Sequence, residues 1–538
     1  MRFAARFMAP PALTAMVVVA SLLLSCSGAA ASAAEASTPC AALMQVAVPN
    51  TRITLAREYP AGVNPVPEPP ETIGRLTGVL AASVCRVVGT IAPTPDSAIG
   101  FEVWMPVRGW NGKLDGVGNG GAGGYINYEE MQPGLRRGYA TASTDTGHRG
   151  SPFDGSWMQG HPALVLDFAQ RSQHLTAEVS KAIVQAYYRQ TLAHAYFTGC
   201  SNAGEEGLSE AQRYPLDYDG IVAGAPTVNP THMWPGDLYA AWVVRADPES
   251  LIKKLPALSA AVYAQCDAAD GVQDGVIDDP RQCHFDPASL QCPSGTDAPT
   301  CLTSTQVQWV RKLYHGLDDP SSGKPFWPGL IVGSEANWAD HLRPMPVKLT
   351  RGYFQYLVYA NPAWSYADVA FDFESARTLA DLREADAAFG PVLDALNPDL
   401  RPFRDRGGKL LLYHGWADDS TSPQGTLDYY ANVLAATGEG SETRAAGAGN
   451  RFVRLFMVPG MGHCTGGPGF DSFDPLTALE TWVEQGKVPE QIVAAHRTEG
   501  KAVRTRPLCP FPERAAYRKT GSIDEASSYV CRVPAQHR

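Results

Sequence analysis

The sequence has no cluster of basic residues, and its overall charge is acidic. It contains 44 Lys and Arg against 55 Asp and Glu, which gives a formal net charge of −11. Proteins that bind nucleic acid or other polyanions generally present a basic patch. We therefore expect no nucleic-acid partner.

Several cofactor and metal motifs are also missing. No Gly-Lys-Ser/Thr follows the glycine-rich stretch at residues 110–124, and no Gly-x-Gly-x-x-Gly opens a clear helix, so nothing indicates a bound nucleotide. The Cys-x-x-Cys spacing of zinc sites is absent as well. We expect no organic cofactor and no zinc.

The N-terminal segment is too short for a membrane span. An apolar stretch from about Thr14 to Leu24 follows two arginines and falls below the roughly 20 residues that a transmembrane helix needs. Ala31-Ser32-Ala33 is typical of a signal-peptidase site and predicts a signal peptide over residues 1–33. Leu23-Leu24-Ser25-Cys26 supports an alternative, a lipoprotein leader that ends before Cys26. Both predict export to the periplasm or beyond, with membrane contact only through a lipid on Cys26.

Length, apolar content and cysteines agree with an exported globular protein. The chain has 538 residues, of which 44% are apolar, enough for one large domain with an insertion or for two domains. Of the 11 cysteines, Cys26 lies in the leader. The other ten are an even number, which in an oxidising compartment predicts five disulfides.

Strand and helix patterns alternate on both sides of a long irregular segment. Short, Pro-rich strands fill the start of the chain, up to about Gly109. Further strand candidates are Gly138–Asp145, Ile221–Pro226, Lys409–Gly415 and Phe452–Val458, and residues 174–190 have helical periodicity. Residues 228–397 are aromatic-rich and interrupted by proline. This order predicts an α/β fold with an insertion.

Ser201 stands where an apolar run meets a helix-competent segment. Gly199 and Ala203 flank it, and small neighbours are what a nucleophile on a strained strand-to-helix elbow requires. An ordinary Gly/Ser turn in a βα connection is the alternative interpretation. The glycine-rich stretch Trp110–Gly124 could bring backbone N–H groups to such a nucleophile, so we interpret it as an oxyanion loop.

An acid and a base follow Ser201 in the chain order of α/β-hydrolases. Asp418 follows the strand Lys409–Gly415, and His463 follows the strand Phe452–Val458. Loops at the carboxyl ends of strands are where open α/β sheets place their sites. We predict a triad of Ser201, Asp418 and His463, with Asp419 as the direct rival of Asp418. We expect one carboxylate of this pair to be solvated.

Cysteines adjoin both the proposed nucleophile and the proposed base. Cys200 precedes Ser201 and Cys464 follows His463. A bond between them would fix the relative position of the two loops. The alternative, Cys200 as a thiol nucleophile, would leave another cysteine unpaired.

These motifs resemble the tannase and feruloyl esterase family of α/β-hydrolases, which includes mono(2-hydroxyethyl) terephthalate hydrolases. The resemblance rests on Gly199-Cys200-Ser201, His463-Cys464, Trp110–Gly124, Gly138–His148 and His414–Asp418, and it covers about Cys40 to Cys531. It implies a doubly wound, mostly parallel sheet formed by residues 34–227 and 398–538. It also implies a lid domain over residues 228–397.

The resemblance further implies residue roles. The triad would be Ser201, Asp418 and His463, and the oxyanion donors would be the backbone N–H groups of Asn202 and of Gly121 or Gly120. The implied disulfides are Cys200–Cys464, Cys40–Cys85, Cys266–Cys283, Cys292–Cys301 and Cys509–Cys531. The chain departs from the family at one place, where the family has two glycines and often a basic residue and this chain has Ala203, Gly204, Glu205 and Glu206. The family's charge at the pocket mouth therefore does not carry over to this chain.

An acidic loop lies in the insertion. Residues 266–278 concentrate carboxylates and glycines, as calcium loops do, although a solvated acidic turn is the alternative. The family's lid binds calcium through such a loop. The resemblance thus implies a structural calcium ion with the side chains of Asp267, Asp270 and Asp274 and the carbonyl groups of Val272 and Val276 as ligands.

The expected function is hydrolysis of esters of hydroxylated aromatic acids. We rank feruloyl esters before gallate esters and both before terephthalate monoesters, from how common each activity is in the family. Some of the lid aromatics at Trp327, Trp338, Tyr353–Tyr356 and Trp364 should line the pocket, since aromatic acyl groups need flat apolar walls. An inactive calcium-dependent binding protein is the alternative from another class.

Overall fold

The computed structural model describes residues 37–66, 76–319, 321–343, 348–366, 371–440 and 451–534. The predicted signal peptide and the lipidation of Cys26 lie outside these residues. Among the helices of the described part, none combines the length and the apolar character of a membrane span.

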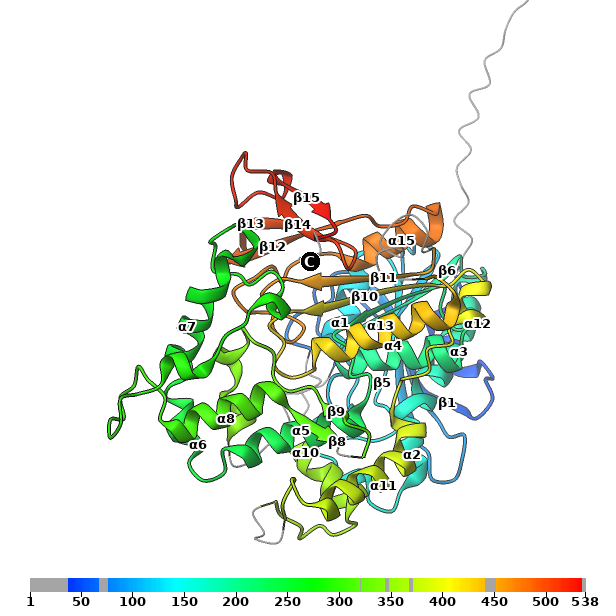
Figure 1. Ribbon diagram of the computed structural model, residues 1–538. Coiled ribbons are helices and arrows are strands. Elements are labelled where there is room, and N and C mark those ends of the chain that lie inside the picture. Colours follow the sequence, from blue (N-terminus) through cyan, green and yellow to red (C-terminus); the bar gives the residue numbers. More distant parts are fainter. Residues whose placement is uncertain are drawn as a thin grey trace, which may run out of the picture. The chain divides into compact units, whose positions relative to one another are not determined.

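A nine-stranded sheet is the centre of the fold, with strand order β1-β2-β3-β5-β4-β6-β7-β10-β11 (Figure 1). β1, β2, β3 and β5 pair antiparallel at one edge, and β5, β4, β6, β7, β10 and β11 pair parallel. The mostly parallel sheet confirms the predicted α/β class. The strands are β1 (Thr51–Tyr59), β2 (Val84–Ile91), β3 (Ile99–Pro106), β4 (Lys113–Val117), β5 (Ala140–Thr144), β6 (His194–Cys200), β7 (Gly220–Gly224), β10 (Lys409–Gly415) and β11 (Val453–Val458).

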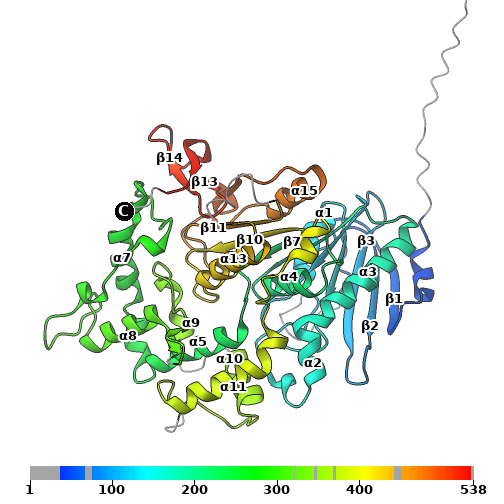
Figure 2. The same cartoon turned by 45° about the vertical axis from the view of Figure 1, so that its right-hand side comes forward.

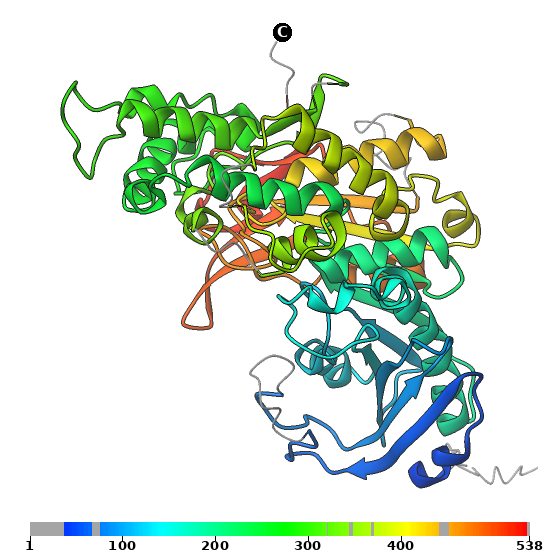
Figure 3. The ribbon, with the colours of Figure 1, turned by 90° about the horizontal axis from the view of Figure 1, so that it is seen from below.

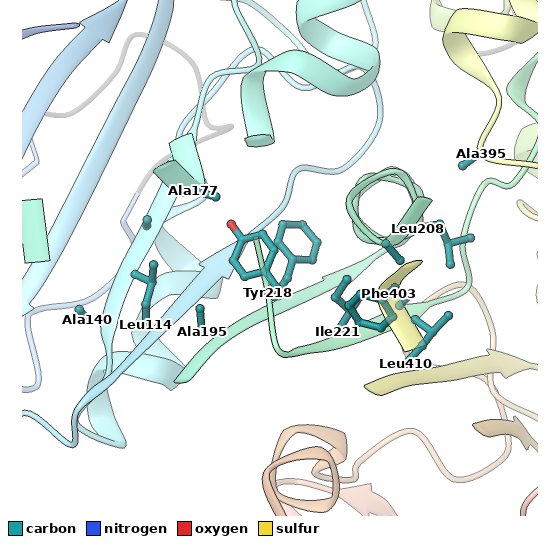
Figure 4. Packing of buried hydrophobic residues seen from close by; sticks show 14 of the residues in the cluster. Leu114, Ala140, Ala177, Ala195, Leu208, Tyr218, Ile221, Ala395, Phe403 and Leu410 are labelled. Atoms are coloured by element: carbon teal, nitrogen blue, oxygen red, sulfur yellow. The ribbon is translucent and has the colours of Figure 1, made fainter. Parts of the chain in front are cut away.

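Helices cover both faces of this sheet. Side chains of α3 (Ser172–Tyr188), α4 (Asn202–Arg213) and α13 (Pro423–Thr437) join one apolar core with the strands. Figure 4 shows Leu208 of α4 beside Ile221 of β7 and Leu410 of β10 in this core. On the opposite face, α15 (Pro475–Gln485) and α1 (Tyr128–Arg136) pack in two other clusters. Strands covered on both sides explain the continuous apolar runs in the sequence.

The segment between β7 and β10 is mostly helical and has a core of its own. Figures 2 and 3 show its green helices grouped away from the blue strands β1 and β2. Their core also takes in Met158 and Phe168, which precede α3. The boundaries 228–397 stay a prediction. The elements are α5 (Pro230–Val243), α6 (Pro248–Ile252), α7 (Leu255–Cys266), α8 (Ser304–His315), β8 (Leu317–Asp319), β9 (Lys324–Trp327), α9 (Ala339–Leu342), α10 (Lys348–Gly352), α11 (Ala376–Leu393) and α12 (Arg401–Asp405).

Two parts of the chain differ from the sequence-based expectation. The stretch Trp110–Gly124 is not a loop throughout, because its middle forms β4 and only residues 118–124 remain as a glycine-rich loop. The C-terminal segment forms two hairpins that the sequence did not predict. They pair β12 (Ile492–Thr498) with β13 (Lys501–Leu508) and β14 (Arg514–Tyr517) with β15 (Tyr529–Arg532).

Candidate active site

Ser201 lies on a sharp turn between β6 and α4. Its φ of 68° and ψ of −130° are in a region that costs a non-glycine residue roughly 1–3 kcal/mol. The neighbours must be small. A Cβ on Gly199 would lie 2.5 Å from the carbonyl oxygen of Ala203, and a Cβ on Gly204 would lie 2.4 Å from that of Gly224. This geometry is a strained elbow and not an ordinary βα turn.

Ser201, His463 and Asp418 form one hydrogen-bonded chain. The Ser201 Oγ lies 2.8 Å from His463 Nε2, and His463 Nδ1 lies 2.9 Å from Asp418 Oδ2. The three residues follow the carboxyl ends of β6, β11 and β10, which lie close together in the parallel part of the sheet. The backbone N–H groups of Ser420 and Thr421 donate to Asp418 Oδ1, each at 2.9 Å. The carboxylate is thereby held facing the imidazole.

The charges of His463 and Asp418 suit proton transfer at His463. Burial alone would raise the pKa of Asp418, but the charge of His463 and the hydrogen bonds from His414 and His463 hold it well below its usual value. Burial acts to lower the pKa of His463, and the charge and hydrogen bond of Asp418 outweigh it, so this pKa is raised. Asp418 therefore stays ionised and orients the imidazole.

Asp419 has a different partner. His341 Nε2 lies 3.0 Å from Asp419 Oδ2, and both side chains are 12% exposed. We expected one of the two adjacent carboxylates to be solvated, and this was wrong, because the insertion covers Asp419 and supplies His341 as its counter-charge. His341 was not predicted, since 78 residues separate it from Asp419 and no local pattern marks it.

All ten cysteines of the described chain are paired as the resemblance implied. Cys200 and Cys464 form the bond that joins the Ser201 elbow to the His463 loop. Cys200 is therefore not available as a thiol nucleophile. The other bonds are Cys40–Cys85, Cys266–Cys283, Cys292–Cys301 and Cys509–Cys531.

The glycine-rich loop is tied to the start of α4 through Glu206. The backbone N–H of Asn119 donates to the Glu206 carboxylate at 3.0 Å, and the side chains of Gln173 and Asn202 donate to it at 2.8 and 3.1 Å. The N–H of Gly120 donates to the Tyr125 hydroxyl, so Gly121 is the better of the two candidate donors in this loop. Glu206 thus connects both segments that are predicted to hold an oxyanion.

Glu205 and Glu206 do not place negative charge at the pocket mouth. They are 5% and 3% exposed. Burial raises the pKa of Glu206 to about 8, although its three hydrogen bonds act to lower it. The pKa of Glu205 is raised mainly by burial and also by the charge of Asp394. The departure from the family pattern therefore does not charge the pocket mouth, although the buried Glu205 lines the cleft itself.

A cleft of about 1070 Å³ opens beside Ser201 and His463. Its insertion side is lined by Met233 and Trp234, by Asp237 and His341, and by Leu349 and Thr350. None of the predicted lid aromatics lines it among the described residues, which corrects the expectation. Trp327, Trp338, Tyr353 and Phe354 are instead buried in the core of the insertion, and Trp364 packs against that core. Trp234 is the aromatic side chain that the insertion places in the cleft.

The acidic loop gathers carboxylates without converging them on one point. Asp267 Oδ1 accepts from the N–H groups of Asp274, Gly275 and Val276. Asp274 Oδ2 is held by the guanidinium groups of Arg504 and Arg506, at 2.6 and 2.5 Å. In the described part of the chain no three acidic, His or Cys side chains meet as a metal site. Arg504 and Arg506 therefore compete with the implied calcium ion for Asp274, and calcium binding stays a prediction.

Comparisons with known proteins agree with this geometry. Residues 85–532 match the family model described as "Tannase and feruloyl esterase". A protein named an uncharacterized esterase from Xanthomonas campestris is 38% identical, covering 94% of this chain and 93% of its own, and a probable feruloyl esterase B-2 from Aspergillus terreus is 30% identical, covering 91% and 94%.

Solved structures extend the agreement to the fold. The crystal structure of feruloyl esterase B from Aspergillus oryzae superposes with a TM-score of 0.82 at 28% identity, covering 90% of this chain and 98% of that one. A tannin acyl hydrolase from Aspergillus niger, at 22% identity and a TM-score of 0.74, shares the fold over 92% of this chain and 93% of its own. The chain belongs to the tannase and feruloyl esterase family and is a carboxylic ester hydrolase with an α/β-hydrolase fold.

Proposed function

We propose that the protein is an exported serine esterase that cleaves esters of hydroxylated aromatic acids, of the feruloyl type, through an acyl-enzyme. The observation that carries the proposal is the chain from Ser201 through His463 to Asp418 at the edge of a large cleft. The feruloyl preference is supported by the names of the relatives, several of which are called probable feruloyl esterases.

The reaction follows from the positions of these groups. His463 Nε2 takes the proton of the Ser201 hydroxyl as its oxygen attacks the ester carbonyl carbon. The N–H groups of Asn202 and Gly121 stabilise the oxyanion that forms. His463 then donates the proton to the departing alcohol oxygen, which leaves an acyl group on Ser201. A water molecule that gives its proton to His463 attacks the acyl carbonyl carbon, and His463 returns the proton to Ser201 Oγ as the bond between this oxygen and the acyl group breaks and the aromatic acid leaves.

Export is supported by the disulfides, since five such bonds are typical of an oxidising compartment. Mass spectrometry of the mature N-terminus tests this. We expect cleavage after Ala33 or a lipidated Cys26, and an intact leader on the cellular protein would contradict export.

The enzyme test uses wild type and Ser201→Ala with methyl ferulate, methyl gallate and mono(2-hydroxyethyl) terephthalate. We expect methyl ferulate to be the best substrate and Ser201→Ala to lower its kcat at least about a thousandfold. Asp418→Asn and Asp419→Asn form a matched pair, of which the first should lose far more kcat because only Asp418 contacts His463. Equal rates in wild type and Ser201→Ala would overturn the serine mechanism, whereas no hydrolysis of any of the three esters by wild type would leave a binding protein as the alternative.

A further inference from the structure

Two charged side chains of the insertion line the same cleft as the catalytic serine. Asp237 lies on α5 and His341 on α9, and both are nearly buried, with 14% and 12% of the side chain exposed. They lie close enough to the triad for charges to interact. The charge of His341 opposes the rise in the pKa of His463, and burial raises the pKa of Asp237 to about 6 against the charges of His341 and His463. The proposed mechanism assigns them no role.

The ring nitrogens of His341 are used unequally. Nε2 lies 3.0 Å from Asp419 Oδ2, within hydrogen-bond distance. Nδ1 lies 3.7 Å from Asp237 Oδ1, which is too long for a direct hydrogen bond. The Thr350 hydroxyl donates a long hydrogen bond to Asp237 Oδ2, at 3.4 Å.

Both groups are ready to bond a third atom. Burial would lower the pKa of His341, but the hydrogen bond to Asp419 and the charges of Asp237 and Asp419 raise it to about 9, so Nδ1 carries a proton at neutral pH. An oxygen placed about 2.8 Å from both His341 Nδ1 and an Asp237 oxygen would accept from the ring and donate to the carboxylate. A neutral hydroxyl group has this dual capacity, whereas a carboxylate lacks the hydrogen and an ammonium lacks the acceptor.

The surroundings favour a hydroxyl group carried on an aromatic ring. Met233 and Trp234 precede Asp237 on α5, and Leu349 lies on α10; all three line the cleft and are mostly apolar. With two carboxylates facing one imidazolium, the cluster has a net charge of about −1, which disfavours a second acidic group on the ring.

We propose that Asp237 and His341 form a binding site for a phenolic hydroxyl group of the aromatic ester. The inference rests on the proposed function and gives a residue basis for preferring feruloyl-type esters over terephthalate monoesters, whose ring bears a carboxylate. Asp419 acts indirectly here, as the group that orients His341.

The experiment compares methyl p-coumarate with methyl cinnamate, which lacks only the ring hydroxyl group. We expect wild type to favour the hydroxylated ester in kcat/KM by about 10- to 100-fold, and Asp237→Ala and His341→Gln each to reduce this ratio toward one, through slower hydrolysis of p-coumarate. Asp386→Ala is the matched control, since Asp386 pairs with His232 in the insertion and does not line the cleft. Its ratio should stay at the wild-type value.

A second variant, expected to gain activity on one ester, distinguishes a loss of hydroxyl recognition from a loss of folding. Asp237→Asn removes one negative charge and should raise the rate on mono(2-hydroxyethyl) terephthalate relative to methyl cinnamate several-fold. Unchanged ratios in Asp237→Ala and His341→Gln, or equal losses on both esters, would overturn this inference alone. Failure of wild type to hydrolyse either ester would overturn the proposed function together with it.

Discussion

The disulfide between Cys200 and Cys464 should support catalysis as well as folding. It joins the residue before Ser201 to the residue after His463 across 264 positions of sequence. We consider the double variant Cys200→Ala/Cys464→Ala, with Cys292→Ala/Cys301→Ala as its control. The control bond spans 9 positions, lies in the insertion and adjoins no catalytic residue.

The chain-entropy model gives the expected cost to stability. Closing a loop of 264 residues contributes about 5.6 kcal/mol and a loop of 9 residues about 2.6 kcal/mol, both as upper limits. Catalysis responds to position as well. The Ser201 Oγ and His463 Nε2 are 2.8 Å apart, and a misplacement of about 1 Å costs on the order of a hundredfold in rate. We therefore expect a kcat about a hundredfold lower for the Cys200/Cys464 variant and within about twofold of wild type for the control.

The assay measures kcat on methyl ferulate at a temperature where circular dichroism shows each variant folded, and the free energy of unfolding by urea titration. Paired variants are needed because a chemical reductant would act on all five bonds. If the Cys200/Cys464 variant keeps its kcat within about threefold while losing stability, the bond contributes to folding only. An equal loss of kcat in the control would show that the effect is not local.

Three further predictions concern pH, the glycine-rich loop and calcium. The kcat/KM for methyl ferulate should rise with pH through an inflection above 6.5. His463 must be neutral to accept the serine proton, and Asp418 raises the pKa of His463 above its usual 6.5. An inflection below pH 6.5 would contradict this. Glu206→Gln places an amide NH₂ against groups that all donate, so kcat should fall about tenfold with KM within about twofold. The control Glu484→Gln weakens the pair with Lys113 but can still accept from the Tyr196 hydroxyl, far from the loop, and should match wild type. An unchanged kcat for Glu206→Gln would show that the network does not position the loop. Calcium should raise the Tm relative to EDTA and Asp270→Asn should abolish the difference, although binding requires Asp274 to leave Arg504 and Arg506; equal Tm values would count against the ion.

The parts of the site that follow strands could be predicted from the sequence. Lys409–Gly415 contains a run of apolar residues, Leu410–Tyr413, between Lys409 and His414. It forms β10 with the bounds that the sequence predicts. Because parallel strands end at one edge of the sheet, Ser201, Asp418 and His463 meet there although they are far apart in the chain. The cysteines beside two of them added the evidence that those two loops touch.

The choice between Asp418 and Asp419 could not be made from the sequence. Adjacent side chains in a turn point in different directions, and the direction depends on the hydrogen bonds that the turn forms. Asp418 Oδ1 accepts from the N–H groups of Ser420 and Thr421, which fixes this carboxylate on the inner side of the turn. Asp419 then points to the insertion, where His341 meets it.

The residues that line the cleft also could not be predicted from the sequence, for a related reason. Aromatic residues of the insertion serve mainly to build its core, because it must bury apolar surface of its own before it can cover a site. Trp338 and Tyr353 are fully buried there. Which aromatic side chain is left for the cleft depends on the packing of α5, and composition carries no information on that.

The two imidazoles of the cleft are kept in different protonation states by the carboxylates around them. His341 faces Asp237 and Asp419, and its pKa of about 9 keeps it charged at neutral pH, so it cannot accept a proton from Ser201. His463 bonds Asp418, and the charge of His341 opposes the rise in its pKa. The charge on the insertion side of the cleft thus helps to keep His463 available as a base. A substrate hydroxyl group bound between His341 and Asp237 would leave that charge in place, which makes recognition of a neutral ring substituent compatible with catalysis at the adjoining histidine.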